Sequence, residues 1–261
     1  MTLRLQYMAM RLLYNFILAV QELFTLCIRA VLNLFRRPLY LRETMTQMDI
    51  LGVGSILIVI LTGFFAGGVL ALQSAKTLKS FGAINITAQL VSISVVRELG
   101  PVLTALIAAG RIGSGISSEL GSMVVTEQID AMRALGTDPI KKLVTPRLVA
   151  TTIMLPLLTI AADLAGLVGG WLVSFYTLNL DTYLYWHTTK LSLTYIDIVE
   201  GLTKPLVFGF IIGIVGCYFG LSTRGGTRGV GQSTTHAVVV ASILVIVSDF
   251  FMNKLLLELR Y

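Results

Sequence analysis

Four charged residues interrupt long apolar stretches of the sequence: Arg97 and Glu98 in one stretch, and Lys204 and Asp249 in two later ones. Charged side chains inside a bilayer are costly, so they usually pair or mark the path of a substrate or ion. Counted inward from the expected outer ends of their segments, the four differ in depth by about one to two helical turns. We therefore expect a polar layer in the outer half of the membrane, with Asp163 nearer the midplane.

This polar layer has two interpretations. It could line a cavity in which the cations bind an anionic headgroup, or it could be an ion-pair network that ties helices together. Arg97 and Glu98 are adjacent, so on a helix they point about 100° apart and must find different partners. The residues themselves leave both interpretations open.

A polar segment at 126–139 has the signals of a short helix. Thr126 is expected as its N-cap, Gly136 suits its C-terminal end, and Pro139 prevents its continuation. Such a helix between two apolar segments either contacts a cytoplasmic partner or is an ordinary interfacial loop helix. The candidate contact residues are Glu127, Gln128, Ile129, Asp130, Met132, Arg133, Leu135, Gly136 and Asp138.

Small residues spaced four apart form two rows just before this segment. Small residues at that spacing let helix backbones approach closely, either within one chain or between two copies of it. The first row is Gly110, Ser114 and Ser118, and the second is Gly113, Ser117 and Gly121.

No nucleotide, metal or catalytic site is predicted. Residues 226–233 have the glycine and serine spacing of a P-loop, but Gln232 stands where the phosphate-binding lysine would be, and an apolar span precedes them. We expect a flexible loop there. His187 and His236 have no neighbours at metal-ligand spacing, and no nucleophile elbow is present. The chain is therefore expected to bind no cofactor.

The composition places the elements that carry these residues in a membrane. The 261 residues are 55% hydrophobic and only 13% charged, with a mean hydropathy of +0.83, whereas soluble domains are about one-quarter charged. The net charge of +6 is not concentrated as nucleic-acid binding would require. We expect one all-α integral membrane domain over residues 1–261.

Residues 3–36 are expected to form an amphipathic helix that lies in the plane of the membrane. Apolar residues recur there at helical spacing, and a polar stripe along the whole length is unsuited to crossing a bilayer. Packing against a soluble partner is the alternative. The stripe comprises Arg4, Arg11, Asn15, Glu22, Arg29, Asn33 and Arg36, and Arg36-Arg37-Pro38 ends the helix.

Five membrane spans follow by hydropathy. They are expected at about 50–74, 86–111, 148–177, 198–221 and 235–257. Most lysines and arginines outside them fall in the N-terminal segment or in loops on the same side, so the positive-inside rule places the N-terminus inside and the C-terminus outside. The outer loop at about 178–197 carries four aromatic residues that are expected to anchor it at the interface: Tyr183, Tyr185, Trp186 and Tyr195.

Residues 95–147 also resemble a known family. The succession of RELGP at 97–101, AGRIGS at 109–114, ELGSM at 119–123, TEQIDAM at 126–132 and LGTDP at 135–139 is similar to the signature region of the MlaE/YrbE permeases. These are the membrane subunits of Mce-associated lipid ABC transporters. LTKPLVFG at 202–209 resembles the family's fourth span, and the likeness covers essentially the whole chain.

The resemblance implies a homodimeric permease of the bacterial inner membrane that moves phospholipid toward or from the cell envelope. It implies that a separate cytoplasmic ATPase uses ATP and docks on 126–139, and that a periplasmic Mce-domain protein binds the outer side. Arg97 and Glu98 occupy the RELGP positions and are thereby implied in the lipid cavity, followed by Lys204.

The residues permit a second class of function. Arg97, Glu98, Asp163 and Asp249 could form the relay of an ion-coupled secondary transporter. The capped segment at 126–139 favours the ABC permease, because a secondary transporter needs no ATPase dock. A lipid-modifying enzyme is disfavoured by the lack of a nucleophile or metal constellation.

Overall fold

The computed structural model describes residues 2–34, 36, 38 and 40–260, and within them it forms helices joined by turns. Arg37, in the predicted end of the N-terminal helix, lies outside the described residues. The elements in chain order are α1 (Thr2–Leu34), α2 (Leu41–Gln47), η1 (Met48–Gly52), η2 (Val53–Ser55), α3 (Ile56–Ser80), η3 (Ile84–Ile86), α4 (Thr87–Ser94), η4 (Val95–Leu99), α5 (Gly100–Ala108), η5 (Ala109–Gly113), α6 (Ser114–Val125), α7 (Gln128–Ala134), η6 (Ile140–Val144), α8 (Thr145–Leu178), α9 (Thr182–Ser192), α10 (Tyr195–Leu221) and α11 (Gly226–Arg260).

Six helical stretches of the described chain are long and apolar enough to cross a bilayer. They are Ile17–Leu34, Leu41–Ser80, Ile84–Val125, Ile140–Leu178, Tyr195–Leu221 and Gly226–Glu258. The last five contain the five predicted spans, whose boundaries were too narrow, above all for the first two. Helical hydrogen bonding continues into polar sequence beyond the apolar core of a span, and a hydropathy window does not detect this continuation.

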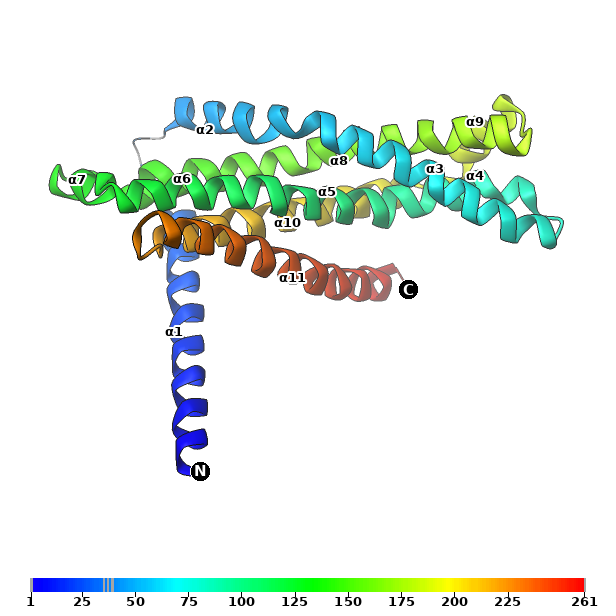
Figure 1. The fold of residues 1–261 in the computed structure, drawn as a ribbon. Helices are drawn as coiled ribbons and strands as arrows, with labels where there is room; N and C mark the ends of the chain where they lie inside the picture. The colour runs from blue at the N-terminus through cyan, green and yellow to red at the C-terminus, as the bar shows by residue number, and fades with distance from the viewer. Residues whose placement is uncertain (1, 35, 37, 39, 261) are drawn as a thin grey trace.

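α1 qualifies as a span by composition, but its direction differs from that of the other five. Figure 1 shows the five stretches running along one direction and α1 running across them. Leu26, Ala30 and Asn33 of α1 are buried, whereas Phe24 and Ile28 are exposed. Asn33, predicted on the polar stripe, instead faces the bundle. The in-plane position stays a prediction, which the crosswise course of α1 supports.

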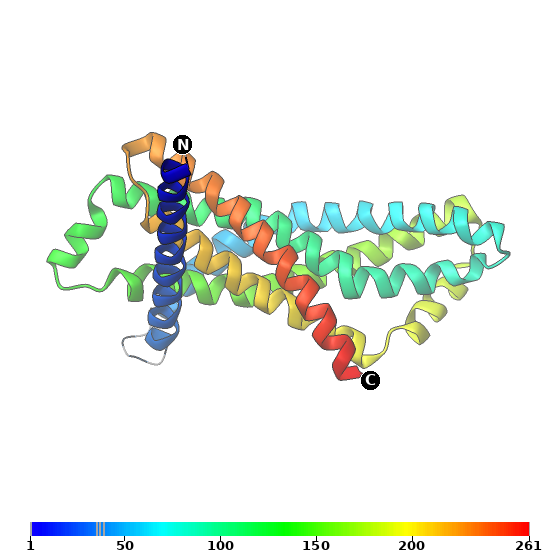
Figure 2. The ribbon, with the colours of Figure 1, turned by 90° about the horizontal axis from the view of Figure 1, so that it is seen from below.

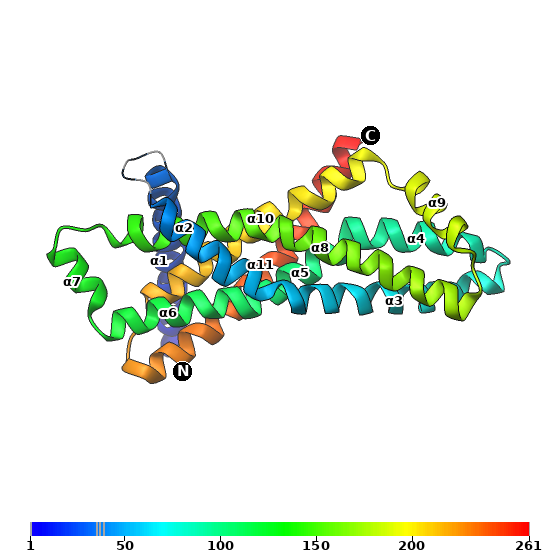
Figure 3. The same cartoon turned by 90° about the horizontal axis from the view of Figure 1, so that it is seen from above.

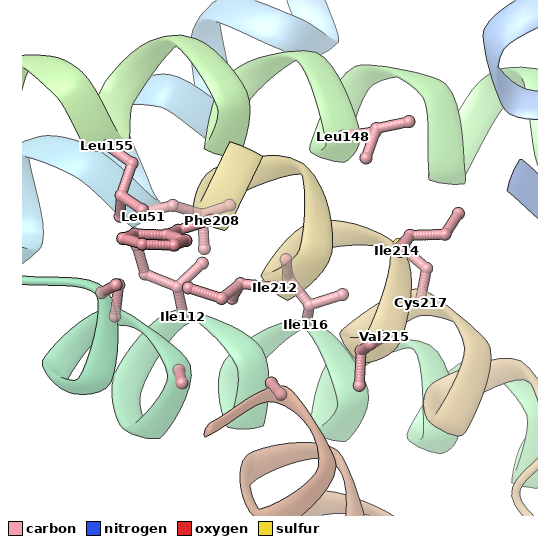
Figure 4. Packing of buried hydrophobic residues seen from close by; sticks show 14 of the residues in the cluster. Leu51, Ile112, Ile116, Leu148, Leu155, Phe208, Ile212, Ile214, Val215 and Cys217 are labelled. Carbon is pink, nitrogen blue, oxygen red and sulfur yellow. The ribbon is translucent and has the colours of Figure 1, made fainter. Parts of the chain in front are cut away.

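The centre of the bundle is packed from three long stretches of chain. Figure 4 shows Ile112 and Ile116 of η5 and α6 lying against Phe208 and Ile212 of α10, with Leu155 of α8 beside them. All five side chains are at most 1% exposed. Lipid tails are as apolar as these side chains, so close packing rather than exclusion of water holds this centre together.

The closest approach between two helices is that of α3 and α8. A Cβ atom added to Gly67 would overlap the backbone carbonyl of Gly166, and one added to Gly63 would overlap the backbone of Ala162. Glycine is therefore required at these positions, because the two backbones are already in contact.

The two predicted rows of small residues have different surroundings. Gly113, Ser117 and Gly121 are buried. A Cβ atom added to Gly216 or Gly220 of α10 would meet Gly113 or Ser117, respectively, and one added to Gly121 would meet Thr223. Gly110 and Ser118 are exposed. The second row is thus an intramolecular crossing, and the first lies on the surface.

The loops alternate between the two ends of the bundle. Figures 2 and 3 show α7, the start of α11 and α1 at one end, and Figure 1 shows α9 at the other. This agrees with the prediction that α1, the loop with α7 and the start of α11 lie on one side and the loop with α9 on the other. The residues predicted as a flexible loop at 226–233 are instead the first turns of α11, joined to the preceding turn by a 2.9 Å hydrogen bond between the Thr223 and Ser233 hydroxyls.

Tyr185 of α9 is buried, contrary to its predicted role as an interface anchor. Its side chain is 1% exposed, and its hydroxyl donates to the carbonyl of Leu167 at 3.1 Å. This burial raises the pKa of the Tyr185 phenol above its ordinary value. Tyr183 and Tyr195 are exposed as expected, at 74% and 79%. Tyr185 therefore fixes α9 onto α8, and the other aromatics remain candidates for the interface.

Candidate functional site

The polar layer is built around one widened turn of helix, the π-helical η4. Pro101 follows Arg97 by four residues and has no N–H, so the carbonyl of Arg97 cannot receive the usual i to i−4 hydrogen bond. The ammonium of Lys204, on α10, donates to this carbonyl at 2.7 Å. The proline thus creates the acceptor that Lys204 occupies.

Arg97 is paired with the first turns of α10. Its Nε donates to Oδ1 of Asp197 at 2.7 Å and lies 3.7 Å from Oε2 of Glu200. Asp197 is held in place by a capping box, in which its Oδ2 accepts from both the backbone N–H and the hydroxyl of Thr194. The carboxylate that faces Arg97 is therefore positioned by the start of its own helix.

Lys204 joins three helices. Its Nζ lies 2.9 Å from Oε1 of Glu98 on η4 and 3.6 Å from Oδ1 of Asp249 on α11. Asn253 completes the group by donating to Glu98 at 3.0 Å and to Asp249 at 3.2 Å. The structure thus brings together all four predicted residues of the layer: Arg97, Glu98, Lys204 and Asp249.

The cations of this cluster are not free to bind an anionic headgroup, contrary to what one interpretation of the sequence expected. Two cations face four carboxylates, and both cations already form ion pairs. Lys204 is 1% exposed. Arg97 and Glu98 retain solvent-accessible side chains, at 26% and 45%, and they line a pocket of about 290 Å³ with Glu200 and Asn253. The accessible part of the cluster is thus predominantly acidic.

Asp197, Glu200 and Asn253 were missed in the sequence. Asp197 lies one residue before the predicted start of the fourth span, at the end of the predicted outer loop. The T-x-x-D spacing of Thr194 and Asp197 would have indicated a helix start there. Asn253 follows Asp249 by four residues, which places both on one helix face.

Asp163 lies apart from the cluster. It is buried in α8 against Gly100, whose added Cβ would overlap its Oδ1. That Oδ1 atom has no hydrogen-bond partner in the described chain. Within residues 40–260, no hydrogen bond or ion pair joins Asp163 to Arg97, Glu98 or Asp249. A continuous relay through all four is therefore not formed in this structure.

An apolar groove starts from the same widened turn. Leu99 of η4 lines it together with residues of α3, including Phe65, Val69 and Leu70, and its volume is about 610 Å³. Gln73 also lines the groove. One turn of helix thus contributes Arg97 and Glu98 to a charged pocket and Leu99 to a groove wide enough for hydrocarbon.

α7, the predicted coupling helix, projects from one end of the bundle (Figure 3). It ends in a Schellman motif: the N–H of Thr137 donates to the carbonyl of Met132 at 2.9 Å, and that of Gly136 to Arg133 at 3.0 Å. Gly136 has φ of +74°, as the motif requires. The C-terminal end was therefore predicted correctly.

The start of α7 was predicted incorrectly. Thr126 ends α6, where its hydroxyl donates to the Ser122 carbonyl at 2.8 Å, and it caps no part of α7. Glu127 takes the N-cap position with a left-handed φ of 59° and no side-chain cap. The chain turns sharply between α6 and α7 because Glu127 adopts this conformation.

The predicted contact residues of 126–139 divide by exposure. Ile129 is 3% exposed and Met132 is half-buried, so both attach the helix to the bundle. Leu135 is 82% exposed. The remaining predicted residues, all exposed, are Glu127, Gln128, Asp130, Arg133, Gly136 and Asp138.

Replacing Gly136 with alanine is expected to loosen this end of α7 without affecting the bundle. The added Cβ meets no atom within 4 Å, but a non-glycine residue at this φ costs about 1 kcal/mol. Hydrogen exchange should accelerate at 132–139, while the thermal midpoint of the whole protein stays at the wild-type value. A large fall in that midpoint would contradict the prediction.

No group of three or more His, Cys, Asp or Glu side chains in the described residues is arranged to hold a metal ion. The two cysteines, Cys27 and Cys217, are not joined in a disulfide.

Comparison with known proteins identifies the family. The model of the family "Permease MlaE" matches residues 44–255. A probable ABC transporter permease protein of Rickettsia typhi is 45% identical over 229 residues, covering 88% of each chain. The intermembrane phospholipid transport system permease protein MlaE of Haemophilus influenzae is 36% identical over 211 residues, covering 80% of this chain and 81% of its own. The chloroplastic Arabidopsis thaliana protein Trigalactosyldiacylglycerol 1 is 34% identical over 226 residues, covering 87% of this chain and 65% of its own.

These matches confirm the resemblance to the permease family, which covers most of the protein. The match to the family model includes residues of all five bundle-aligned stretches. The chain belongs to the MlaE family of ABC transporter permeases, and it is a multi-pass membrane protein.

Proposed function

We propose that this chain is the membrane subunit of an ABC transporter that moves phospholipid between the inner membrane and the cell envelope. The observation that carries the proposal is the position of η4. This turn contributes charged residues to a polar pocket and Leu99 to an apolar groove. Adjacent polar and apolar sites suit an amphiphile with a charged headgroup and hydrocarbon chains. The Haemophilus influenzae relative is named for intermembrane phospholipid transport.

The headgroup would meet Arg97 and Glu98, the two accessible charges of the cluster. A lipid phosphate reaches the guanidinium of Arg97 by competing with Asp197, while an ammonium on the headgroup can bind Glu98 or Glu200 directly. Lys204 and Asp249 lie behind them and position them. In this proposal, substrate binding exchanges one set of ion pairs for another.

ATP is used by a partner, which docks on α7. Its exposed residues include Leu135, whose isolated apolar side chain is suited to insert into a pocket on another protein. Asp130 and Arg133 form an exposed pair at 2.8 Å beside it. This places α7, α1 and the start of α11 on the cytoplasmic side, with the C-terminus in the periplasm. The chain itself binds no cofactor in this proposal.

Two further partners complete the proposed transporter. A second copy of the chain forms a homodimer, for which the exposed row of Gly110 and Ser118 is available. A periplasmic Mce-domain protein binds the end that carries α9. Both partners are proposed from the family resemblance.

Replacing Leu135 with serine tests the docking of the ATPase. We expect the affinity for the ATPase to fall by about 2 kcal/mol, or roughly 30-fold, because an apolar side chain that becomes buried on docking is lost. The substitution should not affect folding, because the Leu135 side chain is 82% exposed. Co-purification of the ATPase and ATP-dependent transfer of labelled phospholipid from proteoliposomes are the two measurements.

Leu191→Ser is the matched control, because Leu191 is 74% exposed on α9 at the other end of the bundle. It should retain the ATPase, which is the measurement that this control addresses. If the control lost the ATPase and Leu135→Ser retained it, the ATPase would bind the α9 end, and the proposed docking on α7 would be wrong. Lipid transfer that proceeds without any ATPase would replace this proposal with an ion-coupled transporter.

A further inference from the structure

A second polar pocket lies between the two chain segments that lead to and from α7. It has a volume of about 280 Å³ and is lined by α2, the end of α6, η6 and the start of α8. Glu119 lines it from the segment before α7, and Lys142 and Arg147 from the segment after. It therefore lies at the opposite end of the bundle from α9, away from the Arg97 cluster.

Arg147 is the buried base of this pocket. The residue is 3% exposed; its Nη2 lies 2.6 Å from Oε1 of Glu119, and its Nη1 donates to the carbonyl of Leu143 at 2.9 Å. Its Nε is buried and has no hydrogen-bond partner in the described chain. Buried donors are rarely left unpaired in native proteins, so this one requires an acceptor that the described residues do not supply.

A second unpaired group lines the same pocket. The Oε1 atom of Gln47, on α2, is buried without a partner. An amide can turn to present its NH₂ group in place of its oxygen, and Gln47 would then donate. One unpaired buried donor, Nε of Arg147, and one unpaired buried amide oxygen, which a turn of the Gln47 amide would replace with a donor, therefore line one pocket from different helices.

The rim of the pocket is basic. Arg42 is exposed and Lys142 half-exposed, and neither forms an ion pair within the described part of the chain. With Arg147 they give three cations against the two carboxylates of Glu43 and Glu119. Because Glu119 is already neutralised by Arg147, the accessible charge is positive. An anion is the ligand that this charge favours.

The depth of the pocket indicates where the anion comes from. Arg42 lies at the first residues of the apolar stretch Leu41–Ser80, and Lys142 at those of Ile140–Leu178. Both cations are thus at the level where a membrane span meets the lipid headgroups. Basic pockets between helices at this level bind the phosphates of lipid headgroups.

We propose that this pocket binds the phosphate of an anionic phospholipid from the leaflet on the α7 side, as a site separate from the transport site. Arg42 and Lys142 contact the phosphate, and Arg147 and Gln47 supply the buried donors. A bound lipid would tie α2 to both segments that support α7. The inference rests on the proposed function only in assigning this leaflet to the cytoplasm.

Native mass spectrometry of the full-length protein tests the site, with phosphatidylglycerol as the anionic probe and phosphatidylcholine as the zwitterionic one. The wild type should retain phosphatidylglycerol preferentially. A cation near the surface contributes about fivefold to anionic lipid binding, so Arg42→Gln with Lys142→Gln should reduce the preference about 25-fold. Each single variant should reduce it about fivefold, which keeps the test valid if the double variant folds poorly.

Arg224→Gln with Arg228→Gln is the matched control. It removes two exposed cations from the same end of the bundle without altering the pocket, and the wild-type preference should persist. An equal loss of preference in both double variants would show general surface attraction and overturn the proposal. Retention of the full preference in the Arg42 and Lys142 variant would overturn it too.

Inorganic phosphate distinguishes the two sources of the anion. Millimolar phosphate should fail to displace phosphatidylglycerol; complete displacement would assign the pocket to a free anion and reject a lipid. ATP-dependent lipid transfer by the wild type is measured separately. No transfer with an intact lipid preference would reject the proposed function alone, and normal transfer with no preference would reject this site alone.

Discussion

Replacing Lys204 with methionine should cost about 1–3 kcal/mol of folding stability, because it leaves the half-buried Asp249 carboxylate and the Arg97 carbonyl without their charged donor. The ammonium lies 2.9 Å from Glu98 and 3.6 Å from Asp249, and it also satisfies the Arg97 carbonyl at 2.7 Å. The Lys204 side chain is 2% exposed, whereas Glu98 is 45% exposed and keeps contact with water when the ammonium is removed. The yield of monodisperse protein and its thermal midpoint are the measurements.

Neutralising the partners separates stability from transport. The variant Lys204→Met with Glu98→Gln and Asp249→Asn has no unpaired charge in this group, and it should recover most of the lost yield. If the recovered protein no longer transfers lipid, the charges of the cluster serve the substrate. Normal transfer by this variant would reduce the cluster to a structural ion-pair network. Wild-type stability of Lys204→Met alone would contradict the prediction itself.

Single substitutions of Arg97 and Glu98 complete this comparison. Arg97→Gln leaves Asp197 its capping-box partner Thr194, so we expect a smaller loss of stability than for Lys204→Met. Glu98 is 45% exposed, and Glu98→Gln should fold well. Reduced transfer by well-folded variants would support contact with the headgroup, and wild-type transfer by both would reject it.

Replacing Gly67 with alanine should also destabilise the protein strongly, at or above the upper end of the usual overpacking range of about 1–3 kcal/mol. The new Cβ would overlap the backbone carbonyl of Gly166, and a backbone atom cannot rotate away as a side chain does. α3 and α8 would have to separate along their length. Thermal unfolding monitored by size-exclusion chromatography is the measurement.

Gly110→Ala is the matched control for this substitution, since no atom lies within 4 Å of its added Cβ. Alanine is favoured over glycine within a helix by about 1 kcal/mol, so the control should be as stable as the wild type or more so. A greater loss of stability for Gly110→Ala than for Gly67→Ala would show that the α3–α8 contact does not limit folding. Loss of dimer without loss of stability would instead identify the Gly110 row as the homodimer contact.

The sequence allowed prediction of the residues that are unusual for a membrane. Arg97, Glu98, Lys204 and Asp249 were recognisable because each is a charge in an apolar stretch, and comparable depth was enough to predict their meeting. Which charges form ion pairs was not predictable, because it depends on which sides of the helices pack together. Arg97 and Lys204, which were expected to be available to a headgroup, instead form ion pairs with Asp197, Glu200 and Glu98.

Local rules failed where backbone conformation departed from the usual one. Thr126 has the residue type of an N-cap, but Glu127 adopts a left-handed conformation that composition does not indicate. Tyr185 has the type of an interface anchor, but the small Gly170 beside it leaves room for its ring to be buried. In both cases a neighbouring residue determined the outcome.

The missing N–H of Pro101 has a consequence for mutational scanning of this protein. The acceptor that it frees belongs to the backbone, so every side-chain substitution at position 97 leaves that acceptor in place for Lys204. A scan of side chains will consequently assign to residue 97 only its guanidinium and never its carbonyl. Substitutions of Pro101 reveal the contribution of that carbonyl, because any other residue at position 101 has an N–H that would compete with Lys204 for the same oxygen.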